Sequence, residues 1–125
     1  NLKPSVEAPT HYASFESNGV LSHIVERYAD GHFNVVAIRP AYATEEKALE
    51  LWAIAEDSAP VSLGLLPEKG SSQLEAPSTI KTIKGSLTLA VSVEPAGGSP
   101  TGAPTGPVVN SAKLIPRAGG NSFSF

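Results

Sequence analysis

The chain has 125 residues, nine of them basic and twelve acidic, with a formal net charge of −3 and no cysteine. This length suits one domain with a substantial core. The acidic balance disfavours nucleic-acid binding, which needs a clustered basic face. The lack of cysteine excludes disulfides and thiolate zinc sites.

The first ten residues differ from the rest of the chain. Residues 1–10 contain two prolines and no clear periodicity, so we expect a linker or loosely attached arm there. Residues 11–125 form the expected single folded domain. The chain begins at Asn1 without methionine and has no apolar run of membrane-span or signal-sequence length. We therefore expect it to be the soluble part of a longer protein, with any span upstream.

Three strands joined by tight turns are predicted next, over residues 11–15, 20–27 and 32–38. Asn18-Gly19 and Asp30-Gly31 separate them, and both pairs favour tight turns because their residues tolerate positive φ. The pattern predicts an antiparallel meander.

The middle of the chain contains the one segment with helical character. Residues 43–49 suit a single helical turn, which Thr44 would cap. Residues 51–55 are apolar on both faces, as in a central strand. Further strands are expected at 61–66, 72–75, 79–83, 87–93, 108–109 and 112–115.

The strongest strand pattern covers residues 87–93, where apolar residues alternate with smaller or polar ones. This period predicts a half-buried strand, with Ser92 and Glu94 on the face away from the core. Closely spaced strands with turn signals between them indicate an all-β fold. We predict an antiparallel β-sandwich, immunoglobulin-like in architecture, with at most one short helical turn.

An uncharged segment follows, residues 95–107, which we call the proline loop. Its four prolines restrict φ and favour extended conformations before them, so we expect a stiff loop. It either makes a Gly97-Gly98 turn and wraps over an open end of the sandwich, or contacts a partner or ligand. The candidate contact residues are Trp52 and Glu94, which lie outside the loop, and the loop residues Pro95, Gly97, Gly98, Ser99, Pro100, Thr101, Gly102, Pro104, Thr105, Gly106 and Pro107.

Two residues outside the loop are expected to support it. Trp52 is predicted in the core against the facing sheet, with its indole N–H donating to a proline-loop carbonyl. Glu94 is predicted to organise the loop by accepting hydrogen bonds from the amides of Gly97, Gly98 and Ser99.

No pattern of reactive residues predicts chemistry. His11, His23 and His32 lack metal-ligand spacing, and no Gly-x-Ser-x-Gly elbow occurs. The carboxylate pairs Glu45-Glu46 and Glu56-Asp57 fall at a helix start and in a turn, where solvation is the default. We expect no catalytic residues, no metal and no cofactor.

Three blocks of sequence carry a family resemblance. They are Leu49-Glu50-Leu51-Trp52-Ala53-Ile54, the segment 60–66 (PVSLGLL) and the run EPAGGSPTGAPTGPV that starts at Glu94. Their order and spacing resemble the C-terminal domain of anti-sigma-K factors over roughly residues 45–115.

The resemblance implies a regulatory role outside the cytoplasm. It suggests a sensing domain of a single-pass membrane anti-sigma factor, on the extracytoplasmic (periplasmic) side of the inner membrane. The whole protein would control an extracytoplasmic-function sigma factor through regulated proteolysis, and would bind that sigma factor through a cytoplasmic domain absent here. A protease or signal partner would act outside, and edge-strand pairing into a homodimer is compatible.

The hypothesis places a first protease cut in the arm of residues 1–10. The alternative is a secreted ligand- or carbohydrate-binding sandwich whose proline loop lines the site. A shared exposed patch of Tyr12, Tyr28, Phe33 and Tyr42 would favour that alternative.

Overall fold

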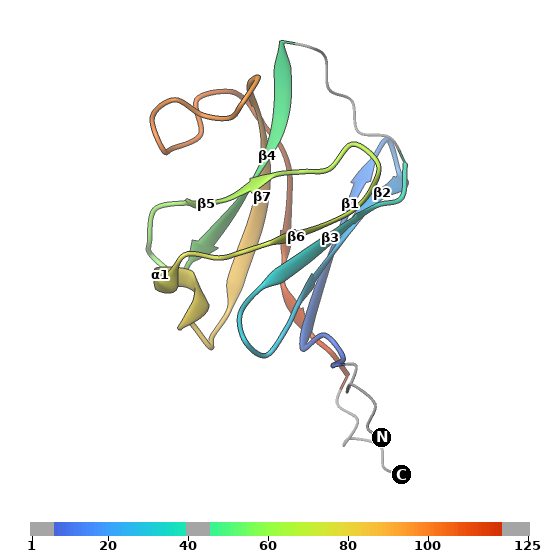
Figure 1. Cartoon of the computed structure of the whole chain (residues 1–125), viewed down its shortest axis with the longest axis vertical. Helices are drawn as coiled ribbons and strands as arrows, with labels where there is room; N and C mark the ends of the chain where they lie inside the picture. Colours follow the sequence, from blue (N-terminus) through green and yellow to red (C-terminus); the bar gives the residue numbers. More distant parts are fainter. Residues whose placement is uncertain (1–6, 40–45, 119–125) are drawn as a thin grey trace, which may run out of the picture.

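The computed structural model describes residues 7–39 and 46–118, which form two antiparallel sheets packed face to face (Figure 1). One sheet has the strand order β6-β3-β2-β1-β9 and the other β5-β4-β7-β8. The strands are β1 (His11–Ser17), β2 (Val20–Arg27), β3 (Phe33–Ala37), β4 (Lys47–Ala55), β5 (Val61–Leu65), β6 (Gly70–Leu74), β7 (Leu87–Pro95), β8 (Val108–Lys113) and β9 (Ile115–Pro116). The predicted antiparallel β-sandwich is confirmed.

The predicted meander forms the centre of the first sheet. Asn18 and Gly19 both have positive φ, 54° and 77°, and connect β1 to β2 in a two-residue turn. Gly31, at φ 94°, donates its amide to the Tyr28 carbonyl at 2.8 Å in the turn before β3. Both turns lie where the sequence places them.

The core lies between the two sheets and takes alternate residues from each strand. Phe15, Val25 and Phe33 contribute from the first sheet, while Leu51 and Leu89 contribute from the second. Each of these five side chains is at most 1% exposed. Their packing fixes which residues of β4 and β7 must point away from the core.

The helical segment is not where the sequence analysis places it. Residues 47–49 belong to β4, where Lys47 pairs with Pro95 and Leu49 with Val93, while Thr44 lies outside the described residues. Pairing along the whole of β7 therefore overrides the local helical preference.

The expected strand at 79–83 is instead a short helix, α1 (Ser78–Lys81). Its one buried residue, Ile80, is 2% exposed. Arg27 of β2 donates its guanidinium to the carbonyls of Ile80 and Ile83, at 2.9 and 3.0 Å. The Ile80 carbonyl, which also accepts the Ile83 amide at 3.0 Å, belongs to α1, and the Ile83 carbonyl lies just beyond it. A tertiary contact from a distant strand thus stabilises this turn.

Strand β7 departs from the predicted half-buried pattern. Ser92 and Glu94, expected on an open face, are both 0% exposed, and Ala90 is 6% exposed. The face of the β5-β4-β7-β8 sheet that points away from the other sheet, called the outer face below, is therefore covered at this point.

The described ends of the chain lie together. Thr10 donates its amide to the Arg27 carbonyl at 2.7 Å and accepts from the amide of Arg117 at 2.8 Å. In Figure 1 these ends lie at the bottom of the molecule and the proline loop lies at the top. The backbone is thus tied into the sandwich from Thr10 onward.

Candidate functional site: a loop anchored on two buried carboxylates

Four side chains of β4 and β7 form the base of the site on the outer face. Leu51 and Val91 belong to the core, so their alternating neighbours on each strand point outward. These neighbours are Glu50, Trp52, Ser92 and Glu94. Each is at most 6% exposed. Two carboxylates are thus buried on a sheet face that would otherwise meet solvent.

Glu94 holds the far end of the proline loop. Its Oε2 atom accepts the amides of Thr105 and Gly106, at 3.0 and 3.3 Å, and Oε1 accepts the Thr105 hydroxyl. The Ser92 hydroxyl donates to Oε2 from the same strand. The predicted role as loop organiser fits this geometry, but the predicted donors were wrong.

Glu50 holds the near end of the loop. Its Oε1 atom accepts the amide of Ser99 at 2.7 Å, and its Oε2 atom accepts the hydroxyl of Ser62 on β5. Gly98, at φ 104°, lies directly over this carboxylate, where an added β-carbon would come within 3.2 Å of Oε1. The Ser99 amide, one of the three predicted to bind Glu94, is therefore bound by Glu50.

Trp52 connects the two strands below the loop. Its indole N–H donates to the Ser92 hydroxyl at 2.9 Å, and that hydroxyl in turn donates to Glu94. The prediction of a core tryptophan was wrong about its face, because Leu51 and Ala53 take the inward positions. The predicted loop carbonyl is likewise not its acceptor.

Ser92 is thus a relay between the indole and the carboxylate, and Ser92→Ala tests it. The variant leaves the buried Trp52 N–H without its acceptor and removes one donor from Glu94. We expect the free energy of unfolding to fall by about 1–3 kcal/mol. Urea denaturation followed by Trp fluorescence measures it, since the chain has one tryptophan. Ser86→Ala, at an exposed position, is the control, and equal losses in both variants would contradict the relay.

The hydrogen bonds to Glu94 decide its charge. Burial alone would raise the pKa of this carboxyl, but donation from Ser92, Thr105 and Gly106 outweighs burial and lowers the pKa to about 2. The side chain is therefore ionised across the physiological range. A fixed anion inside a ring of donors organises a loop and does not serve as a proton donor at neutral pH.

This depressed pKa predicts acid sensitivity. The folded state holds the Glu94 proton more weakly than the unfolded chain, whose pKa is near 4.5, so its stabilisation is complete above pH 4.5. It is lost as the pH falls from about 4.5 towards 2. We expect the stability difference between the native protein and Glu94→Gln to shrink over that interval in urea denaturation. A constant difference between pH 7 and pH 3 would contradict the assignment.

The loop is also braced internally. The Gly98 amide donates to the Pro95 carbonyl at 2.8 Å, in a turn where Gly97 and Gly98 have φ values of 89° and 104°. The Ser99 hydroxyl donates to the Ala103 carbonyl, and the Val93 amide donates to the Pro107 carbonyl at 3.0 Å. The predicted Gly-Gly turn is present. The loop covers the outer face of the sheet and not an open end of the sandwich.

The predicted loop residues are all exposed or half-buried. The exposed ones are Pro95, Gly97, Pro100, Thr101, Gly102, Thr105 and Pro107, while Gly98, Ser99, Pro104 and Gly106 are half-buried. The network also includes three residues that the predicted set lacks: Glu50, Ser62 and Ser92. A carboxylate between Leu49 and Leu51 in an apolar strand was the available signal for Glu50.

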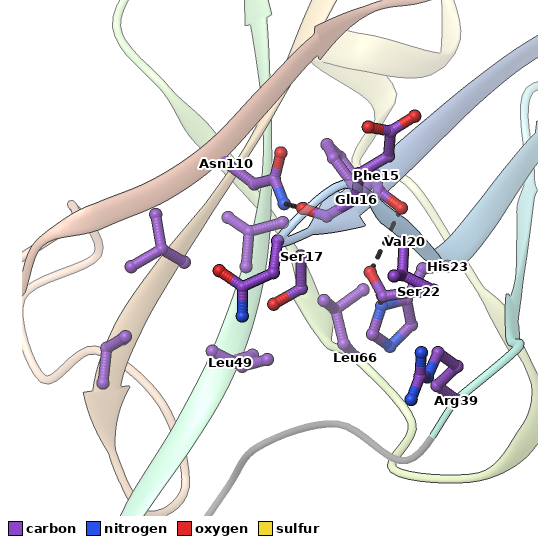
Figure 2. Close-up of a pocket in the computed structure, with 14 residues that line it drawn as sticks. Phe15, Glu16, Ser17, Val20, Ser22, His23, Arg39, Leu49, Leu66 and Asn110 are labelled. Atoms are coloured by element: carbon purple, nitrogen blue, oxygen red, sulfur yellow. Dashed lines mark hydrogen bonds between the residues drawn. The ribbon is translucent and has the colours of Figure 1, made fainter.

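A separate cavity of about 830 Å³ opens between the two sheets (Figure 2). Its lining comes from β1, β2, β4, β7 and β8 with the connections beside them, and includes no residue of the proline loop. The proline loop, which is expected to line a ligand site, therefore does not line this cavity. Among the described residues, no group of three or more His, Asp or Glu side chains is arranged to hold a metal.

Of the four candidate aromatic residues, the three that the structure describes do not form one exposed platform. Phe33 is 0% exposed in the core, and Tyr28 is half-buried and stacks on His32 with ring centroids 4.6 Å apart. Tyr12 is also half-buried, and Tyr42 lies outside the described residues. This arrangement gives little support to a sugar-binding surface.

The fold and site define an all-β module whose loop is anchored from one sheet face. The family model described as anti-sigma-K factor rskA, C-terminal, matches residues 6–108. The chain belongs to this family, which is regulatory and implies a sigma factor as partner. The searches of curated proteins and of solved structures returned no match. No helix in the described part of the chain is long and apolar enough to cross a membrane.

Proposed function

We propose that this domain is the extracytoplasmic regulatory domain of a membrane-anchored anti-sigma factor. The observation that carries the proposal is the family match over residues 6–108. The proposal gains support from the site, because all three sequence blocks that resemble the family contribute to it. Glu50, Ser62 and Glu94 come from one block each, and all three take part in hydrogen bonds on the outer face.

The arrangement of the chain ends would orient the domain if it is anchored. Thr10 and Arg117 meet at one end of the sandwich, opposite the proline loop (Figure 1). If the chain is anchored upstream of Thr10, the proline loop faces away from the membrane. Its exposed surface, uncharged from Pro95 to Pro107, is then presented to the extracytoplasmic space.

Regulation would act on the segment before Thr10. The backbone is hydrogen-bonded to β2 and to Arg117 from Thr10 onward, while Glu7 and Ala8 are exposed and outside any strand. Proteases cut exposed chain that lies outside regular structure. A first cut before Thr10 would separate the folded sandwich from an upstream anchor and start the signal.

Cysteine labelling of the natural full-length protein in intact cells tests the location. Residues 1–125 contain no cysteine, and Lys69 lies exposed in the turn between β5 and β6. We expect Lys69→Cys to react with a membrane-impermeant maleimide before lysis. The protein without this substitution should lack that label. Labelling of Lys69→Cys only after lysis would contradict an extracytoplasmic domain.

A further inference from the structure

The cavity between the sheets has the character of a small-molecule site. Its volume of about 830 Å³ lies within the roughly 300–1,000 Å³ of such sites. Part of its lining is apolar: Phe15 faces it from β1, while Leu49 and Val93, paired across β4 and β7, face it from the other sheet. Val91 and Leu66 complete this surface.

The mouth of the cavity is also partly apolar. Val20 and Val109 line it and are 44% and 53% exposed. The apolar surface thus continues from the buried interior to the rim. An occupant with an apolar chain would cover both.

The polar part of the lining is asymmetric in charge. Arg39 supplies its cation and Glu16 its carboxylate, and Figure 2 shows the Glu16 carboxylate and Arg39 at opposite ends of the view. No ion-pair partner of Arg39 occurs among the described residues. Its backbone is fixed, because the amides of Ile38 and Arg39 both donate to the Ser22 carbonyl, at 2.7 and 3.3 Å.

His23 lies in the same lining but does not add a second charge. Its ring is 3% exposed and contacts the Ser22 hydroxyl at 3.1 Å and the Pro67 carbonyl at 3.4 Å. Burial lowers the pKa of this imidazole, against the opposing effect of the Pro67 carbonyl. At neutral pH the ring is uncharged, so Arg39 is the cation that an anionic group would meet.

We propose that this cavity binds one monoanionic amphiphile of the fatty-acid type. Its apolar chain would lie against Phe15, Leu49 and Val93, and its carboxylate at Arg39. The inference goes beyond the proposed function, because binding to the isolated domain does not depend on where the domain is located.

Calorimetric titration of the protein with octanoate, decanoate and dodecanoate below their micelle concentrations tests the proposal. We expect saturable binding of one molecule, with affinity rising roughly threefold to fourfold per added methylene until the cavity is filled. Amide shifts in NMR spectra should cluster at residues around Leu49 and Val93. No saturable binding, or affinity independent of chain length, would overturn the proposal.

Matched variants locate the site. Val93→Phe places a bulkier side chain against the expected path of the apolar chain and should weaken dodecanoate binding at least about tenfold. Val108→Phe makes the same change at a position on β8 that is 56% exposed and does not line the cavity, and should leave binding unchanged. Equal effects of the two variants would overturn the assignment.

The charge selectivity is tested separately. The native protein should prefer dodecanoate to dodecylammonium, and Arg39→Gln should weaken dodecanoate binding by roughly threefold, as expected for an exposed ion pair. Arg39→Gln should not weaken the binding of dodecylammonium. A native preference for the cation, or an unchanged preference in Arg39→Gln, would overturn the anionic assignment.

Discussion

Replacing Glu94 with alanine is expected to lower the free energy of unfolding by about 3–5 kcal/mol. The carboxylate is 0% exposed and accepts hydrogen bonds from Ser92, Thr105 and Gly106. Its removal leaves these donors without their acceptor and opens space under the proline loop. Urea denaturation followed by Trp fluorescence measures the loss.

Two further variants separate the hydrogen bonds from the charge. Glu94→Gln keeps the shape and two acceptor positions but introduces a donor next to the donating groups, so an intermediate loss is expected. Glu68→Ala removes an exposed carboxylate and should change stability by less than about 0.5 kcal/mol. A Glu94→Ala protein as stable as Glu68→Ala would contradict the anchoring role.

Replacing Gly106 with alanine is expected to cost about 2–4 kcal/mol. A β-carbon on Gly106 would overlap the carbonyl oxygen of Val93, which is backbone and cannot rotate away. The loop must therefore lift from β7. This breaks the hydrogen bond from the Val93 amide to the Pro107 carbonyl and the hydrogen bond from the Gly106 amide to the Glu94 carboxylate.

Amide hydrogen exchange at Val93 gives this prediction a local readout, because its protection should fall in Gly106→Ala. Gly85→Ala is the matched control, since its added β-carbon meets nothing within 4 Å and Gly85 lacks positive φ. Native-like stability and unchanged Val93 protection in Gly106→Ala would contradict the close approach.

Most of the sandwich could be predicted because its signals are local. A two-residue hairpin turn requires positive φ, which Asn18 and Gly19 both tolerate, so this pair specifies the β1–β2 turn without help from the rest of the chain. The apolar run at 51–55 indicates a central strand, and β4 does lie between β5 and β7. Such features depend on neighbours in sequence.

The face that Trp52 occupies could not be predicted in this way. Its strand is apolar on both faces, so the alternation does not say which side meets the other sheet. Leu51 takes the core position, and Trp52 is buried on the outer face, to which the proline loop, more than forty residues later, is hydrogen-bonded through Glu50 and Glu94. A single-strand pattern contains no information about a contact supplied from so far along the chain.

The partners of Glu94 were missed for a related reason. The amides of Gly97, Gly98 and Ser99 are the nearest in sequence, but the Gly98 amide donates to the Pro95 carbonyl inside the Gly-Gly turn, and the turn carries the Ser99 amide across to β4. There Glu50 binds the Ser99 amide, and the returning chain brings Thr105 and Gly106 to Glu94. The path of the loop, and not sequence separation, decides which carboxylate each amide meets.

The proline loop is held at both ends by buried carboxylates. Amide hydrogen exchange of the native protein, read residue by residue by NMR at neutral pH, tests it most directly. We expect the amides of Ser99 and Thr105 to be protected and the amide of Gly102, an exposed residue between them, to exchange rapidly. Exchange of Ser99 and Thr105 as fast as Gly102 would contradict it.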